Sequence, residues 1–293
     1  MGYGSYTASD WTKLKTSRQL TEKQNVEEVF VKKGCDPRFN PRHIGTRECF
    51  DSEDHPNSTP IVVGLDVTGS MGYLAVKVAS EALNDLILKL YSTGAVEDPA
   101  LMCAAYGDYL DKSPLQVTQF ESDIRIAEQL LDIWFENCGS GDVVPTCLWE
   151  FLSRHTDIDS IKKRNKKGFV FTIGDGAEIR KDAVGRTIMR VVGDDLGPDV
   201  TVADILKETE KKFHVFHIMI GKDGNSDILY GHRIVIAQNS IDCIPEIILG
   251  TIQLQNGKSL EDVIAGCDEI KKPTVDNALR QLCLSDTGSA IRF

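Results

Sequence analysis

The chain has 293 residues and a formal net charge of −11, so it is long enough for one large hydrophobic core with appendages or for two small domains. The acidic charge argues against a nucleic-acid partner, because binding to a phosphate backbone relies on basic surfaces that release counterions. The apolar runs are too short to span a bilayer and the start of the chain lacks an apolar leader segment, so we expect neither a membrane partner nor secretion.

The cysteines predict a reducing environment. All eight lack C-x-x-C pairing and zinc-finger spacing. Several lie in apolar segments, as Cys103 and Cys243 do. We therefore expect buried free thiols and a cytoplasmic location.

Residues 1–59 are expected to form an N-terminal extension. They are rich in charged residues and turn formers, with a helix expected over residues 10–20 and a strand over residues 26–31. Prolines recur from Pro37 to Pro60 among polar residues. This composition predicts irregular chain that lies over the main domain.

The most informative stretch begins with the apolar, mostly β-branched residues 61–65, which predict a strand buried on both faces of a sheet. Asp66 ends this run, and a glycine-rich turn with Thr68 and Ser70 leads into an amphipathic helix expected to begin near Tyr73. One carboxylate and two hydroxyls thus lie where a parallel strand meets a helix, the usual ligand-binding edge of an open α/β sheet. Such oxygens can converge on Mg²⁺, or on Mn²⁺ or Ca²⁺.

The later segments alternate between strand and helix patterns. Strands are expected at residues 101–106, 115–120, 168–173, 213–220 and 232–237. Helices are expected at residues 75–90, 124–134 with Ser122 as N-cap, 204–212, 240–253, 260–265 and 275–284. The alternation predicts a doubly wound, mostly parallel α/β sheet with helices on both faces.

Two further segments can supply oxygens to the same edge of the sheet. In the glycine-rich loop over residues 138–146, Asp142 directly follows Gly141, and Thr146 opens the next helix. Asp175 follows an apolar strand within Gly174-Asp175-Gly176. The alternative interpretation of the first segment is a helix-start loop in which Asp142 is only a cap.

These three segments resemble the metal-ion-dependent adhesion site (MIDAS) of von Willebrand factor A (VWA) domains. The sequence from Asp66 to Ser70 is similar to the Asp-x-Ser/Thr-x-Ser signature, and Asp175 stands where the family has Thr-Asp-Gly. The chain departs from the family at Gly174, which replaces the threonine, and in the second loop, where Thr146 replaces the glutamate of a bacterial subset. The resemblance implies an intracellular bacterial or phage type of VWA domain over residues 60–255, followed by a C-terminal helical extension over residues 256–293.

The family resemblance implies a six-stranded, Rossmann-like sheet in the order 3-2-1-4-5-6, with the short third strand antiparallel at one edge. It implies that Thr68 and Ser70 bind the cation directly, while Asp66 and Asp175 hold it largely through water. An acidic side chain of a protein partner then completes the coordination, so the implied function is a non-enzymatic interaction module. An AAA+ ATPase is one partner class that the resemblance implies. A third carboxylate from Asp142 would strengthen retention of the ion and weaken capture of an anionic partner.

The enzyme alternatives fit less well. A serine hydrolase could use Ser70 with Asp175 and either His214 or His217, but Thr68 stands where the nucleophile elbow has glycine. The two histidines also face opposite sides of one strand, because their separation is odd. A haloacid-dehalogenase-like phosphatase would need a second acid at the position of Thr68, and no phosphate-binding glycine motif follows a strand.

A basic cluster at residues 162–167 precedes one of the apolar strands. We interpret it as a solvated loop, with a docking or localisation patch as the alternative.

Overall fold

The computed structural model describes residues 4–21, 23–136, 143–175, 183–221 and 232–285, and the account below concerns these residues. The expected Asp142 and the C-terminal end of the chain after residue 285 lie outside them.

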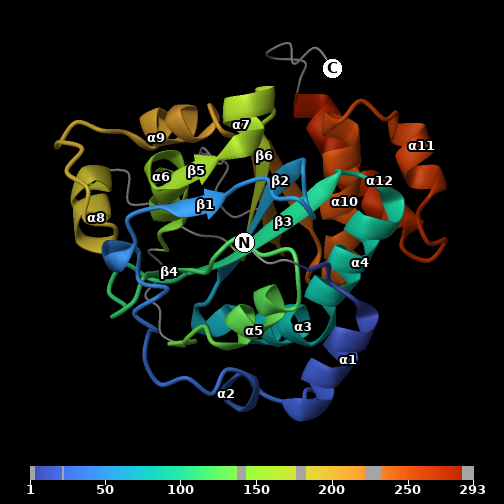
Figure 1. Ribbon diagram of the computed structural model, residues 1–293, viewed down its shortest axis with the longest axis horizontal. Helices are drawn as coiled ribbons and strands as arrows, with labels where there is room; N and C mark the ends of the chain where they lie inside the picture. The colour runs from blue at the N-terminus through green and yellow to red at the C-terminus, as the bar shows by residue number, and fades with distance from the viewer. Residues whose placement is uncertain (1–3, 22, 137–142, 176–182, 222–231, 286–293) are drawn as a thin grey trace.

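A six-stranded, mostly parallel sheet forms the centre of the molecule (Figure 1). Its order is β4-β3-β2-β6-β7-β8, and only β4 runs antiparallel to its neighbour. The strands are β2 (Ser58–Asp66), β3 (Asp98–Tyr106), β4 (Leu115–Val117), β6 (Gly168–Gly174), β7 (Phe213–Ile220) and β8 (His232–Ile236). The doubly wound α/β fold and the strand order expected from the sequence are confirmed.

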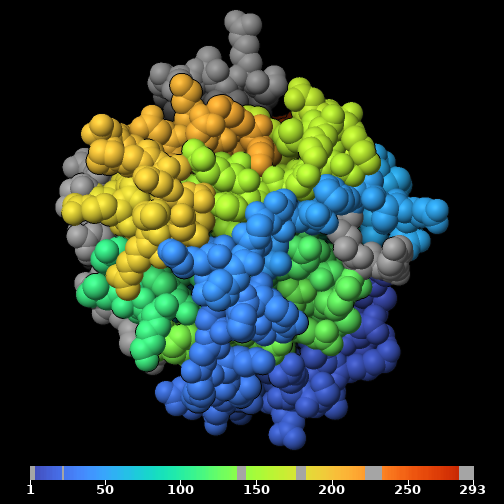
Figure 2. Space-filling model, turned by 60° about the vertical axis from the view of Figure 1, so that its left-hand side comes forward, coloured from blue at the N-terminus to red at the C-terminus, as the bar shows by residue number. Residues whose placement is uncertain are grey.

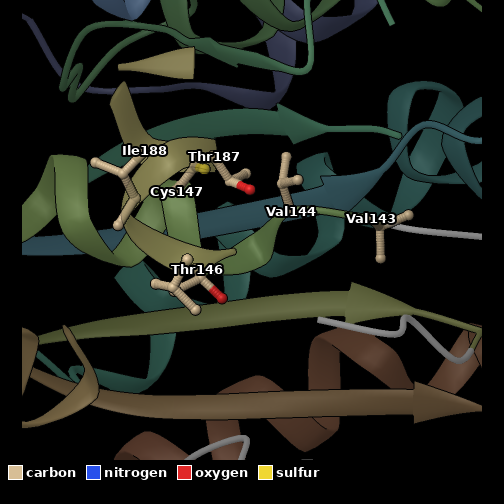
Figure 3. Close-up of a pocket in the computed structure, with 7 residues that line it drawn as sticks. Val143, Val144, Thr146, Cys147, Thr187 and Ile188 are labelled. Atoms are coloured by element: carbon tan, nitrogen blue, oxygen red, sulfur yellow. The ribbon is translucent and has the colours of Figure 1, made fainter. Parts of the chain in front are cut away.

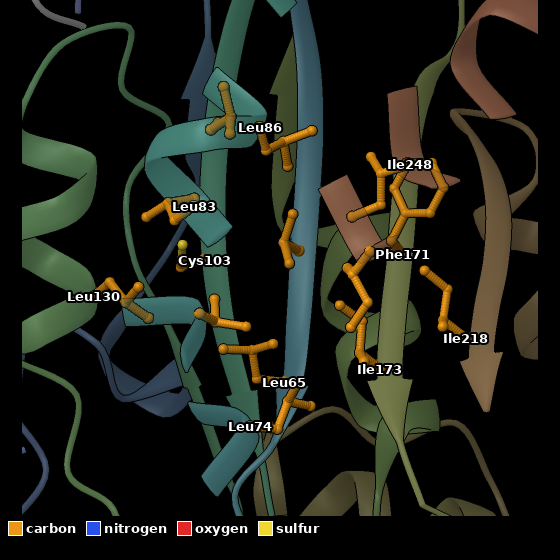
Figure 4. Packing of buried hydrophobic residues seen from close by; sticks show 14 of the residues in the cluster. Leu65, Leu74, Leu83, Leu86, Cys103, Leu130, Phe171, Ile173, Ile218 and Ile248 are labelled. Atoms are coloured by element: carbon orange, nitrogen blue, oxygen red, sulfur yellow. The ribbon is translucent and has the colours of Figure 1, made fainter. Parts of the chain in front are cut away.

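Successive strand residues point to opposite faces of the sheet, and each face has its own hydrophobic cluster. On β2, Val63 and Leu65 face one cluster, and Val62 faces the other. Figure 4 shows part of the first cluster, with Leu65 and Ile173 on the strands and Leu83 and Leu86 on α4 (Leu83–Thr93). Both faces of β2 are therefore buried, as its continuous apolar run predicts.

Helices cover both faces. The α4 face of the sheet is covered by α1 (Ala8–Ser17), α3 (Gly72–Lys77), the π-helical η3 (Val78–Ala82), α4 (Leu83–Thr93), α5 (Arg125–Leu131), α10 (Ile244–Gln255) and α12 (Lys272–Ser285). The α6 face is covered by α6 (Pro145–Arg154), α8 (Val184–Val191) and α9 (Val202–Thr209). Short 3₁₀ helices are η1 (Pro41–His43), η2 (Gly69–Met71) and η4 (Gln238–Cys243), and α11 (Leu260–Ala265) packs beside α10 and α12.

The N-terminal extension is more ordered than its composition predicts. The expected strand over residues 26–31 is wrong, because α2 (Val26–Val29) forms there. Its N-terminus is fixed by a capping box between Asn25 and Glu28, which outweighs the strand preference of the valines. Further along, β1 (Arg47–Cys49) pairs in parallel with β5 (Thr156–Ile158) in a separate two-stranded sheet. Three-residue strands are too short to give a recognisable alternation in sequence.

The helix expected to begin after Ser122 begins later. Its N-cap is Ile124, and the carboxylate of Asp123 accepts a hydrogen bond from the backbone of Arg125 at 3.0 Å. The helix also ends before Trp134, whose backbone exchanges hydrogen bonds with the side chain of Gln116. Competing polar contacts therefore shorten this helix at both ends.

The basic cluster is a solvated loop only in part: its first half ends the helix α7 (Asp159–Arg164), and residues 165–167 form an exposed loop. Arg164 binds Asp51 through two hydrogen bonds of 2.7 and 3.0 Å, and it also donates to the backbone carbonyl of Ser58. Lys163 bridges Asp51 and Asp159. These contacts join the N-terminal extension to the start of β2.

The seven cysteines among the described residues are all free thiols. A search of the described helices found none that combines the length and the apolar character needed to cross a membrane.

The ion pair between Arg164 and Asp51 predicts a pH-dependent contribution to stability. Burial acts to raise the pKa of Asp51, but hydrogen bonds from Arg164 and Lys163 outweigh it and hold the pKa below its usual value. A lowered carboxyl pKa stabilises the fold above the unfolded value of about 4, and this contribution is lost as pH falls through the folded value. We expect Arg164→Met to lower the free energy of unfolding by about 1–3 kcal/mol at pH 7 and by much less at low pH.

Urea unfolding at both pH values measures this difference. The exposed pair between Lys13 and Asp10 supplies a matched control, and Lys13→Met should change stability little. An equal loss for Arg164→Met at both pH values would contradict the assignment.

Candidate metal centre

The turn after β2 gathers three side-chain oxygens. Asp66 is 1% exposed, and its Oδ1 accepts hydrogen bonds from the backbone N and the hydroxyl of Thr68, at 2.8 and 2.7 Å. The hydroxyl of Ser70 lies 3.4 Å from that of Thr68. Because Thr68 uses its hydroxyl hydrogen on Asp66, the lone pairs of that oxygen remain available for a cation. The structure thus brings Asp66, Thr68 and Ser70 together, and their role as ligands remains a prediction.

Asp175 lies at the end of the neighbouring strand. Leu65 of β2 pairs with Ile173 of β6, so Asp66 and Gly174 occupy adjacent strand ends. A Cβ atom placed on Gly174 would lie 3.1 Å from Oδ2 of Asp66. Asp175 follows directly and is exposed, and its charge contributes to the raised pKa of Asp66. The two carboxylates therefore belong to one electrostatic environment.

The glycine at position 174 has a local cause. The hydroxyl of Tyr106 donates to the backbone carbonyl of Ile173 at 2.9 Å, and it would lie 3.0 Å from a Cβ atom on Gly174. A side chain at position 174 would also approach Asp66. Tyr106 and Asp66 together occupy the space that the threonine of the family motif would need.

The end of β3 adds two carboxylates that the sequence analysis did not include in the site. Asp108 and Asp111 are 1% and 4% exposed. The backbone N of Asp108 donates to Asp111 at 2.8 Å, and the backbone N of Leu110 donates to Asp108 at 2.8 Å. Asp108 directly follows Gly107 at the end of a predicted strand, and this strand-end position was the signal that could have identified it.

Burial and neighbouring negative charges raise the pKa values of Asp66 and Asp111. Burial raises the pKa of Asp66 to about 7 despite the two hydrogen bonds from Thr68, and Asp175 and Asp111 contribute. Burial likewise raises the pKa of Asp111 to about 6. Arg190 lies close to Asp111: its guanidinium is 4.4 Å from the centre of the Tyr109 ring and donates to the backbone carbonyl of Asp111. A divalent cation would compensate this concentration of negative charge, and carboxylate and hydroxyl oxygens suit Mg²⁺.

The second expected loop is described only from residue 143 onward. Val143 forms a β-bridge with Asp108, and the backbone N of Val144 donates to Gly107 at 3.1 Å. The end of this loop is therefore held against the end of β3. Asp142 itself lies outside the described residues.

Thr146, the alternative ligand of the second loop, lies in the first turn of α6. It is 4% exposed, and its hydroxyl has no hydrogen-bond partner among the described residues. Figure 3 shows it in a small cavity between α6 and α8, with Val144 and Ile188 among the lining residues. The cavity volume of about 10 Å³ corresponds to about one water molecule. Thr146 therefore remains a candidate ligand.

Neither histidine of the hydrolase alternative is placed to act as a base for Ser70. His217 is fully buried and bonds to the hydroxyl of Thr172 at 2.9 Å, and burial and Arg233 lower its pKa to about 3. His214 pairs with Phe169 near the start of β6. That position is roughly 16 Å along the strand from the end where the carboxylates lie.

The chain matches no family model and no curated protein. Among solved structures it is similar to the pilus adhesin SpaC from Lactobacillus rhamnosus GG in its open conformation, at 10% identity and a TM-score of 0.44, covering 72% of this chain and 31% of that one. It is similar to a von Willebrand factor type A protein from Catenulispora acidiphila, at 13% identity and a TM-score of 0.41, covering 69% and 44%. A third likeness is to the vWF domain of the type V pili tip protein Mfa5 from Porphyromonas gingivalis, at 10% identity and a TM-score of 0.43, covering 69% and 97%.

The chain spans less than half the length of the first two of these proteins. Its own strand order and register establish the α/β architecture.

The crowding around Gly174 can be tested by introducing threonine at this position. We expect Gly174→Thr to lower the free energy of unfolding by about 1–3 kcal/mol, because the new side chain overlaps the hydroxyl of Tyr106. In a Tyr106→Phe background the loss should be smaller by at least about 0.5 kcal/mol, the coupling expected for residues in contact. A double-mutant cycle from urea unfolding measures this coupling, and strict additivity would contradict it.

Proposed function

We propose that the chain is a divalent-cation-dependent protein-interaction module of VWA type, which binds its partner at the carboxyl ends of β2, β3 and β6. The observation that carries this proposal is the hydrogen-bonded arrangement of Asp66, Thr68 and Ser70, with Asp175 on the adjacent strand end. The module makes and breaks no covalent bond.

The arrangement supports a division of roles among the ligands. Thr68 and Ser70 present hydroxyl oxygens to the ion, while Asp66 accepts the hydroxyl hydrogen of Thr68 and, with Asp175, supplies negative charge. Asp142 or Thr146 completes the protein ligands. When bound, Mg²⁺ or Mn²⁺ bridges the module to an oxygen of the partner.

The surface near these ligands supports a protein partner. Tyr73, three residues after Ser70, is 39% exposed, and Leu110, between Asp108 and Asp111, is 67% exposed. Large apolar side chains beside a polar site are typical of protein interfaces. An acidic side chain of the partner would fill the remaining coordination position, unless a ligating Asp142 makes the site too negative. An AAA+ ATPase in the cytoplasm is the partner class that we propose to test first.

Metal titration tests the proposal directly. We expect the wild-type chain to bind Mg²⁺ and Mn²⁺ in isothermal titration calorimetry, and Ser70→Ala and Thr68→Val to lower the affinity at least about 10-fold, because each removes an oxygen ligand. Ser92→Ala is the matched control, since Ser92 is an exposed serine that bonds only to its own helix. Its affinity should equal that of the wild type.

Equal metal affinity of Ser70→Ala and the wild type would contradict the metal site. Covalent labelling of Ser70 by a fluorophosphonate would favour the serine hydrolase instead. With the metal site in place, capture of an AAA+ ATPase should be abolished by EDTA and weakened by Leu110→Ser, a change that leaves the ligands intact. Capture that is indifferent to EDTA would contradict metal-dependent binding.

A further inference from the structure

A second group of metal-ligand side chains lies where α6 and α8 end. Glu150 is on α6, His155 directly follows that helix, and Asp194 follows α8. One ligand atom from each residue lies within 4.8 Å of the other two. The group is distinct from the Ser70 site, because it lies beyond the middle of α6 and Thr146 lies in the first turn.

Hydrogen bonding fixes the histidine in the orientation that ligation requires. Nδ1 of His155 lies 3.0 Å from the backbone carbonyl of Gly45. A carbonyl can only accept, so Nδ1 carries a hydrogen, and Nε2 is the nitrogen that a metal ion would bind, in place of the hydrogen that it shares with Asp194 in the metal-free protein. Nε2 lies 2.8 Å from Oδ2 of Asp194, and the ring stacks on Phe151 at 5.2 Å. A backbone acceptor on the other ring nitrogen is the usual support of a metal-bound histidine.

Glu150 adds a buried carboxyl group to this cluster. Its side chain is 0% exposed, and Oε2 has no hydrogen-bond partner among the described residues. Arg154 approaches only Oε1, at 3.3 Å, from a side chain that is 58% exposed. A buried carboxyl group can serve as a metal ligand when the ion displaces its proton.

We propose that Glu150, His155 and Asp194 form a binding site for a divalent transition-metal ion, with Zn²⁺ as the preferred ion. One imidazole nitrogen and two carboxylate oxygens are ligands that Zn²⁺ accepts, whereas Mg²⁺ and Ca²⁺ are bound through oxygen. Three protein ligands leave one coordination position for water.

The place of this site in the fold indicates a structural role. Gly45 belongs to the N-terminal segment, which Figure 2 shows in blue beside α8 in yellow. Arg42 of the same segment donates to the backbone carbonyls of Met189 and Arg190 near the end of α8, both at 2.8 Å. An ion bound at His155 and Asp194 would tie the end of α6 to the end of α8, beneath this segment. Zn²⁺ should therefore raise the stability of the full chain.

The test uses the full chain, freed of metal with EDTA and then dialysed. We expect Co²⁺, as a spectroscopic substitute for Zn²⁺, to give visible absorption bands that an equivalent of Zn²⁺ abolishes. His155→Gln and Asp194→Asn should lower the Zn²⁺ affinity at least about 10-fold and remove these bands. His43→Gln, which changes an exposed histidine of the same segment, should leave both unchanged.

Circular dichroism establishes whether each variant is folded. Folded variants that bind Zn²⁺ as tightly as the wild type would overturn the proposal, and so would a wild-type chain without Co²⁺ bands. The cluster would then be two ion pairs, His155 with Asp194 and Arg154 with Glu150. If His155→Gln or Asp194→Asn fails to fold, the Co²⁺ absorption spectra of the wild type and of Glu150→Gln are compared instead. Absorption bands that change in Glu150→Gln support the site. Identical bands in the two proteins overturn it.

Discussion

The parallel register of β2 with its two neighbours is the constraint on which the rest of the structure depends. Asp66 pairs with Tyr106 of β3, and Leu65 pairs with Ile173 of β6, so the three strands finish at one level. The carboxylates that follow them therefore meet at one edge of the sheet, although they are far apart in sequence. Both faces of β2 are packed, and a shift of one residue would exchange its two faces. The hydrophobic core thus fixes the positions of the polar groups.

This arrangement concentrates negative charge that the protein alone compensates poorly. Burial raises the pKa of Asp66 to about 7, which reflects the cost of holding this carboxylate ionised in the metal-free protein. The hydroxyl of Thr68 bonds to Asp66 and so keeps its lone pairs directed away from that carboxylate. A bound cation would attract the ionised carboxylate of Asp66, so the charge that is unfavourable without the ion would contribute to binding the ion. We therefore expect the proposed site to couple metal affinity to local stability, as is common where function requires buried charge.

The sequence predicted the sheet well and several local features poorly. Long apolar strands gave clear signals, and the strand over residues 213–220 has the bounds that were expected. The valines near Val26 were misassigned because the capping box of Asn25 dominates locally, and β1 was missed because its pairing with β5 is tertiary. In the candidate site, the resemblance to the family motif predicted Asp66, Thr68, Ser70 and Asp175 as ligands, and that role stays a prediction. Asp108, Asp111 and the cluster around His155 depend on contacts between distant segments, for which no short motif exists.

The most direct test of the central claim is anomalous X-ray scattering from crystals of the full chain grown with Mn²⁺. The account predicts an anomalous peak within bonding distance of the hydroxyl oxygens of Thr68 and Ser70, with Asp66 and Asp175 within reach of the ion or of its bound water. A well-ordered turn at Ser70 without such a peak, or a peak there that Ser70→Ala leaves unchanged, would contradict it.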